Sequence, residues 1–208
     1  MIQTASTQPR EFAPGSSGWC LADLDDPQVE RLWDEGRLEM LEGVLVQMGA
    51  AYYNHLRVVH RLLRQLEDQL EQQGGDVSLE VDLVLDEQTV LKADAVLTLP
   101  EDRRRQRQAR PASSEEDLGR LRVPPTIVIE SVSRGHERHD YEVKRRRYAA
   151  FGVPNYWVVN HFDKSLLCLT LDQGQYREDA RGQGEDELRP AALPGLVIRL
   201  KDVFRSPR

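Results

Sequence analysis

The chain has little of what several classes of protein need. Cysteine occurs only as Cys20 and Cys168, far apart and without metal-ligand spacing, so free thiols in a reducing compartment are expected. No apolar run approaches the roughly 20 residues that cross a bilayer. The N-terminal residues also lack the apolar segment of a signal peptide. We therefore expect a cytoplasmic protein with no membrane partner.

Sequence signatures of several enzyme classes are missing as well. The chain has no phosphate-binding glycine loop, no zinc-type Cys/His spacing, no G-x-S-x-G nucleophile elbow and no internal repeat. Its net charge of −7 implies no strong overall attraction to nucleic acid. A length of 208 residues favours one globular domain. We place that domain at 19–208, behind a flexible polar arm over 1–18.

The stretch 124–160 is predicted to organise the rest of the chain. It reads as a short buried strand, a polar loop, an amphipathic helix and a second buried strand. The first strand, 126–129, is apolar and β-branched and ends in Glu130. A carboxylate at the end of a buried strand is costly unless another group pairs with it.

The helix after this strand supplies a candidate partner. At about 100° per residue, Asp140, Lys144, Tyr148 and Phe151 fall on one face, which also carries the aromatic side chains. Two charged groups on the inward face of an amphipathic helix indicate a pairing network or a functional site.

Before this stretch, two polar residues, His55 and Asp94, each allow more than one interpretation. His55 lies in the first turn of a helix expected over 54–73, where a surface or capping histidine is the favoured interpretation. Asp94 lies in the middle of the apolar strand 90–99, where an edge-strand gatekeeper and a functional acid are equally consistent with the sequence.

Other segments of the chain complete a mixed set of helices and strands. A short helix is expected from Pro27, a hairpin over 38–49, strands at 78–86 and 166–171, and a last strand within 193–204. Residues 101–122 lack an apolar period and are predicted to be an exposed polar insertion. Its arginines could touch phosphates, but neutralisation by the acids at 115–117 is favoured.

Asp94, Glu130 and Lys144 together suggest a chemistry. Two carboxylates on neighbouring strands can hold Mg²⁺, which takes few protein ligands and leaves positions to water and phosphate. An ammonium nearby can steady an attacking water or developing negative charge. Acid, acid and lysine also occur as plain structural ion pairs, so spacing alone leaves both interpretations open.

The order of these residues resembles the PD-(D/E)XK nuclease superfamily, and closely its Uma-two family of restriction endonucleases. The matching segments extend over about residues 30–204: LEMLEGVLVQM with His55 behind it, LKADAVL, PPTIVIESVS, HDYEVKRRRYAAFGVPNYWVV and LPGLVIRL. The resemblance implies an α/β (α+β) restriction-endonuclease-like fold. That fold has an αβββαβ core, a central mixed sheet flanked by helices and an added N-terminal β-hairpin.

The resemblance also implies roles for individual residues. Asp94 and Glu130 would be the metal ligands, and Lys144 would position or activate water. Val132 occupies the position where other members carry this lysine, and Ala93 replaces the usual proline. Asp140 matches an acid that orients Lys144. Glu39 and His55 match family positions near the site. Beside Lys144, the adjacent Arg145, Arg146 and Arg147 could meet the DNA backbone.

The predicted function is Mg²⁺-dependent hydrolysis of DNA phosphodiester bonds, with Mn²⁺ as a substitute cation and a homodimer left open. The alternative is a catalytically silent or partner-dependent module that keeps the fold and binds nucleic acid or protein. The acidic balance of the chain favours this alternative somewhat. A third interpretation is a structural ion-pair cluster without a ligand.

Overall fold

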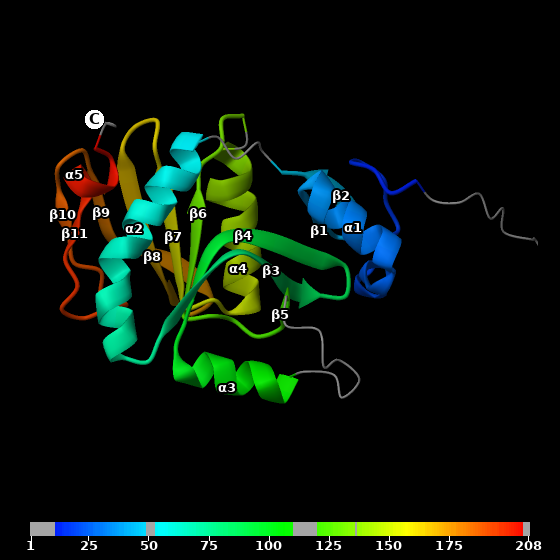
Figure 1. Cartoon of the computed structure of the whole chain (residues 1–208), viewed down its shortest axis with the longest axis horizontal. Helices are drawn as coiled ribbons and strands as arrows, with labels where there is room; N and C mark the ends of the chain where they lie inside the picture. Colours follow the sequence, from blue (N-terminus) through cyan, green and yellow to red (C-terminus); the bar gives the residue numbers. More distant parts are fainter. Residues whose placement is uncertain (1–10, 49–52, 110–119, 136, 206–208) are drawn as a thin grey trace, which may run out of the picture. The chain divides into compact units, whose positions relative to one another are not determined.

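The computed structural model describes residues 11–48, 53–109, 120–135 and 137–205 (Figure 1). The chain divides into two compact units. The first contains residues 1–48 and 86–90, and the second contains 49–85 and 91–208. The single-domain extent predicted from the sequence stays a prediction.

The first unit is built on the predicted hairpin. Strands β1 (Leu38–Leu41) and β2 (Val44–Gln47) pair antiparallel. The Glu42-Gly43 turn has φ of 53° and 74°, the positive values that a two-residue hairpin turn requires. Before the hairpin come a short 3₁₀ turn, η1 (Leu21–Asp25), and helix α1 (Pro27–Gly36).

The predicted arm is partly attached to this hairpin. Ser17 forms a β-bridge with Val44, and the Gly15 amide donates to the Leu45 carbonyl at 2.8 Å. Phe12 packs edge-on against Trp19, with ring centroids 4.8 Å apart. Residues from 11 onward are thus tied down by backbone hydrogen bonds and aromatic packing, whereas residues 1–10 lie outside the described part.

The second unit contains a mixed sheet, which confirms the predicted fold class. Its strands follow the order β4-β6-β7-β8-β9, and β3 pairs with β4 and with β5. The pairs β6–β7 and β3–β5 are parallel, whereas β4–β6, β7–β8 and β8–β9 are antiparallel. Their bounds are β3 (Asp76–Asp86), β4 (Thr89–Thr98), β5 (Arg120–Leu121), β6 (Ile127–Ser131), β7 (Asn155–Asn160), β8 (Ser165–Asp172) and β9 (Gln175–Gln183).

Helices cover both faces of this sheet. Helix α2 (Tyr53–Gln72) lies across the strands in Figure 1, and its leucines and valines share a buried core with Ile127 and Ile129 of β6. Because side chains alternate along a strand, Glu130, which directly follows Ile129, lies on the other face, where its carboxylate accepts from Tyr148 of helix α4 (Arg145–Phe151).

The C-terminal end of the second unit packs beside α2. Strands β10 (Glu187–Leu188) and β11 (Ile198–Arg199) form a two-stranded sheet, followed by the short helix α5 (Leu200–Val203). Gln65 on α2 donates to the Arg199 carbonyl at 3.1 Å and accepts from the Arg199 amide at 2.8 Å. This pair of bonds fixes the last strand against the helix.

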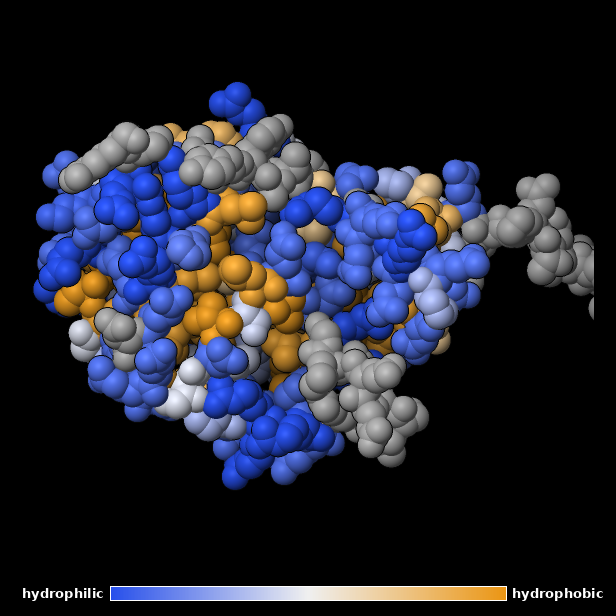
Figure 2. Space-filling model, viewed as in Figure 1, coloured by the Kyte–Doolittle hydropathy of each residue, from blue (hydrophilic) through white to orange (hydrophobic). Residues whose placement is uncertain are grey.

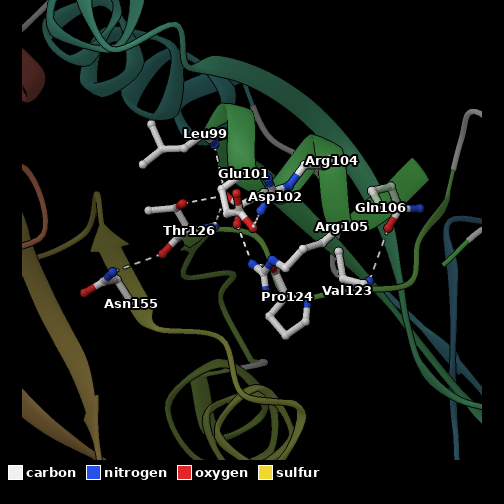
Figure 3. A network of polar contacts seen from close by, with 10 residues as sticks. All are labelled: Leu99, Glu101, Asp102, Arg104, Arg105, Gln106, Val123, Pro124, Thr126 and Asn155. Atoms are coloured by element: carbon white, nitrogen blue, oxygen red, sulfur yellow. Dashed lines mark hydrogen bonds and ion pairs between the residues drawn. The ribbon is translucent and has the colours of Figure 1, made fainter. Parts of the chain in front are cut away.

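The polar stretch 101–122 contains a helix that its sequence did not predict, α3 (Pro100–Ala109). Its anchor is the buried Asp102, which accepts from the Leu99 amide at 2.9 Å and from the amide and hydroxyl of Thr126 (Figure 3). Arg105 donates to Asp102 and to the Pro124 carbonyl. Hydrogen bonds accepted by a buried acid in the first turn therefore define this helix, which is why an apolar period was not needed.

The arginines of α3 are mostly engaged with their own surroundings. Arg104 pairs with Glu101 at 2.7 Å, Arg105 with Asp102, and Arg103 donates to the Gly74 carbonyl. Self-neutralisation agrees with the favoured interpretation of the sequence. The acidic partners seen here are Glu101 and Asp102, which precede the arginines in the chain. Neutralisation by the acids at 115–117 stays a prediction, because those residues lie outside the described part of the chain.

The surface in view is largely hydrophilic, with hydrophobic residues between the polar ones (Figure 2). This agrees with a chain of which 30% is charged. In the described part of the chain, no helix has both the length and the apolar character needed to span a bilayer.

Candidate active site

An ion pair between Lys144 and Glu130 forms the centre of the candidate site. The ammonium nitrogen lies 3.0 Å from Oε1 of Glu130 and donates to the Lys92 carbonyl at 3.1 Å. Both side chains are nearly inaccessible, at 3% and 2% exposure. Lys144 is therefore on the inward face of its helix, as the helical period predicts.

Burial of this ion pair carries an unfavourable desolvation free energy. Removing two charges from water costs several kcal/mol per ion before their attraction repays part of it. Tyr148 adds a hydrogen bond to the same oxygen of Glu130 at 2.7 Å, which supports the ionised form of the carboxylate. A buried ion pair contributes little net stability, so its presence is weak support for a purely structural role.

Asp94 lies next to this pair on the neighbouring strand. In the antiparallel β4–β6 ladder Ala95 pairs with Ile129. One position further along, the residue before Ala95 and the residue after Ile129 lie opposite each other, which brings Asp94 beside Glu130. The Ser131 amide donates to Oδ2 of Asp94 at 2.6 Å. Strand β4 pairs with β6 on one side and β3 on the other, and the edge-strand gatekeeper interpretation is therefore wrong.

The donor set of Asp94 and Glu130 fits a hard divalent cation. Both close contacts of the Asp94 carboxylate involve Oδ2, and its Oδ1 has no protein partner among the described residues. Carboxylate oxygens are the ligands that Mg²⁺ prefers, and one or two suffice when water and phosphate complete the shell. The described residues contain no cluster of three or more His, Cys, Asp or Glu side chains arranged to hold a metal ion.

Asp140 and Lys144 share a short π-helical stretch, His139–Lys144, directly before α4. Such stretches are rare and are frequent at functional sites. The Ser133 amide donates to Oδ2 of Asp140 at 3.3 Å, and the Tyr156 hydroxyl donates to its backbone carbonyl at 2.8 Å. Burial raises the pKa of Asp140 to about 6, although the positive charge of Lys144 and the Ser133 amide both act to lower it.

His55 is buried, so the interpretation as a surface histidine is wrong. Its side chain is 4% exposed, and Nε2 lies 3.1 Å from Oδ2 of Asp94. The distance suits an ion pair if the imidazole is protonated, but the direction of the ring nitrogen does not meet hydrogen-bond geometry, and neither ring nitrogen has a hydrogen-bond partner among the described residues. A tertiary contact between α2 and β4 causes this burial, which the helical period alone did not indicate.

His161 was not singled out by the sequence, yet it lies beside His55, with ring centroids 6.5 Å apart. Its Nδ1 is buried and has no hydrogen-bond partner in the described part of the chain. Burial lowers the pKa of His161, and the neighbouring His55 and Arg134 lower it further. A single histidine after a strand gives no sequence signal of its own.

The remaining predicted residues are Glu39 and the three adjacent arginines. Glu39 is buried on β1 in the first unit, and its role stays a prediction. Arg145 donates to the Tyr176 carbonyl at 2.9 Å, which commits it to packing against β9. Arg146 is exposed and Arg147 half-buried, so Arg146 is the most available of the three to a ligand.

Comparison with known proteins shows two kinds of similarity. The model of the Uma2 family, described as "Putative restriction endonuclease", matches residues 26–201. A solved structure described as a putative nuclease belonging to DUF820 from Anabaena variabilis ATCC 29413 is similar, with a TM-score of 0.63 and 14% identity over 82% of this chain and 90% of that chain. This similarity shows a shared fold.

A second solved structure, a DrdV–DNA complex, gives a TM-score of 0.32 and 17% identity over 74% of this chain and 14% of that chain. No curated protein matches the sequence.

Proposed function

Since the chain belongs to the Uma2 family of restriction-endonuclease-like proteins, we propose that it is a metal-dependent endonuclease that hydrolyses phosphodiester bonds of DNA. Asp94 and Glu130 would hold Mg²⁺, or Mn²⁺ in its place. The bound cation would neutralise charge on the scissile phosphate and lower the pKa of a water molecule.

Lys144 acts as the positioning and charge-stabilising group of this proposal. Its ammonium is held 3.0 Å from Oε1 of Glu130 and donates to the Lys92 carbonyl at 3.1 Å. A donor held in this way can orient an attacking water or stabilise negative charge developing on phosphate. Asp140 adds a buried carboxylate that interacts electrostatically with Lys144.

The observation that carries the proposal is the fully buried Lys144–Glu130 pair beside Asp94. Burying a lysine and two acids in one place costs stability, and such costs are typical of sites selected for chemistry. A plain structural role would be met as well by apolar residues of similar volume.

The test is incubation of the purified protein with supercoiled plasmid and Mg²⁺ or Mn²⁺. Asp94→Asn and Lys144→Met should abolish nicking, with EDTA as a second control. Asp172→Asn and Lys201→Met are matched changes at exposed positions and should nick like the unaltered protein. Nicking that persists in folded Asp94→Asn or Lys144→Met would rule out the proposal.

A second candidate function is a catalytically silent module that binds nucleic acid or protein. The net charge of −7 favours it, because binding to the DNA backbone depends on Lys and Arg contacts with phosphates, and an acidic protein repels DNA wherever such cations are not clustered. Calorimetry with Mg²⁺ separates the two functions when combined with DNA binding at several salt concentrations. Binding of DNA without detectable binding of Mg²⁺ or cleavage would favour the silent module.

A further inference from the structure

An exposed aromatic side chain lies in the turn between β7 and β8. Phe162 is 44% exposed, in a chain with only four phenylalanines. The turn is held rigidly: the Phe162 amide donates to Oδ1 of Asn160 at 2.9 Å, and the Ser165 amide donates to Oδ1 of Asp163 at 3.1 Å. Gln183 on β9 also donates to the Asp163 carbonyl at 2.7 Å. An exposed ring on a fixed turn is preorganised for contact with a partner.

Phe162 belongs to a stack of planar groups. The ring of His161 lies 3.8 Å from that of Phe162 between centroids, with 36° between the planes. The guanidinium carbon of Arg134 lies 5.1 Å from the Phe162 centroid, a cation–π distance. Arg134 is exposed and comes from the loop after β6, so two separate loops build this stack.

The stack leads to the candidate active site. His161 neighbours His55 at 6.5 Å between ring centroids, and Nε2 of His55 is 3.1 Å from Oδ2 of Asp94. The two histidines also carry buried ring nitrogens without hydrogen-bond partners among the described residues. The contacts therefore run without a break from the surface ring to a proposed metal ligand, all within the second unit.

We propose that Arg134, Phe162 and His161 form a stacking platform that receives an unpaired base next to the cleaved phosphate. This inference rests on the proposed function and specifies its substrate class as DNA with a nucleotide out of the stack. Both faces of a paired base are already covered by its neighbours in a duplex, so stacking on a protein ring requires an unpaired one.

The chemistry of the platform suits such a ligand. Stacking on an aromatic ring accepts any base, because every base has a π-face. The guanidinium of Arg134 can stack alongside and donate to the adjoining phosphate. A protein of net charge −7 gains little from long-range attraction to DNA. Stacking therefore supplies binding that the overall charge of the chain does not.

The experiment measures binding of the full chain to three DNA probes that carry 2-aminopurine, whose fluorescence is quenched by stacking. The probes are a single strand, a duplex with the 2-aminopurine as an unpaired bulge, and a fully paired duplex, all with Ca²⁺ replacing Mg²⁺ to limit cleavage. Phe162→Ala is compared with Phe162→Trp, which keeps a ring, and with Leu79→Ala, which removes a side chain of 54% exposure elsewhere in the unit.

Phe162→Ala should weaken binding to the single strand or the bulge by roughly 5- to 150-fold and remove the fluorescence quench. Phe162→Trp should restore both, and Leu79→Ala should stay within about twofold of the unaltered protein. Preference for the single strand over the bulge would identify a single-stranded substrate, and the reverse a base extruded from a duplex.

Unchanged affinity and quench in Phe162→Ala would overturn the platform, as would equal losses on all three probes. Because this readout needs no cleavage, it is separable from the proposed function. A Phe162-dependent quench in a protein that never cuts plasmid would leave the platform standing and reject the nuclease. Plasmid cleavage by a protein in which Phe162→Ala changes neither DNA affinity nor the fluorescence quench would support the nuclease and reject the platform.

Discussion

The raised pKa of Asp140 gives a quantitative test of the electrostatics of the site. Burial raises this pKa from its ordinary value of 3.8 to about 6, against the opposing effects of Lys144 and the Ser133 amide. One pKa unit corresponds to about 1.36 kcal/mol. The carboxylate form of Asp140 therefore destabilises the folded protein by about 3 kcal/mol relative to its unfolded state.

The sign follows from proton binding. Between pH 3.8 and about 6 the folded protein keeps a proton on Asp140 that the unfolded chain has released, so the free energy of unfolding falls as pH rises. Above about pH 6 the full cost is present. The side-chain amide that replaces this carboxyl in Asp140→Asn does not titrate. The stability of Asp140→Asn relative to the unaltered protein should thus increase by about 2.5 kcal/mol between pH 4 and pH 7 and stay level above that.

The assay is urea unfolding of both proteins at half-unit steps from pH 4 to pH 8, analysed as the difference between them so that other titrating groups cancel. Asp172→Asn is the matched control. Its carboxylate pairs with Arg177 at 2.8 Å on the exposed β8–β9 hairpin, and exposed pairs contribute only about 0–1 kcal/mol.

If the difference in free energy of unfolding between Asp140→Asn and the unaltered protein does not change with pH, burial does not raise the pKa of Asp140 and the reasoning is refuted. A difference that falls as pH rises would show that the attraction of Lys144 exceeds the cost of burial.

Two further predictions concern the remaining buried charges. Lys144→Met should lower the free energy of unfolding by about 3–5 kcal/mol, because the buried Glu130 carboxylate loses the cation that pairs with it. Adding Glu130→Gln should recover most of that loss in urea unfolding but none of the nicking activity, and a double variant no more stable than the single one would contradict this. Asp102→Ala should lower stability by about 2–4 kcal/mol, since two backbone amides and the Thr126 hydroxyl lose their acceptor. Thermal unfolding checks this, with the exposed Glu101→Ala as control and nicking at low temperature unchanged.

Much of the fold was predictable because its signals are local. The Glu42-Gly43 turn marked the hairpin, and Asp26 followed by Pro27 marked the start of α1, where the Asp26 side chain accepts from the Gln28 amide at 2.8 Å. The largely continuous apolar runs at 126–129 and 90–99 indicated buried strands, and β6 and β4 are buried along most of their length. Helix α3 was missed because its stability comes from Asp102 contacting Thr126, and no window of sequence around 100–109 contains that contact.

The sequence by itself determined which side of the helical segment 139–151 faces the interior, because residues four positions apart on a helix, here Asp140, Lys144 and Tyr148, lie on one stripe whatever they touch. Only the tertiary structure decided what that stripe meets. The register of β4 against β6 brought Asp94 beside Glu130, and the packing of α2 buried His55 against Asp94. The β7–β8 turn left Phe162 exposed at the end of the same line of contacts. Contacts between residues distant in sequence depend on strand register and on the packing of whole elements, and neither is encoded in a local period.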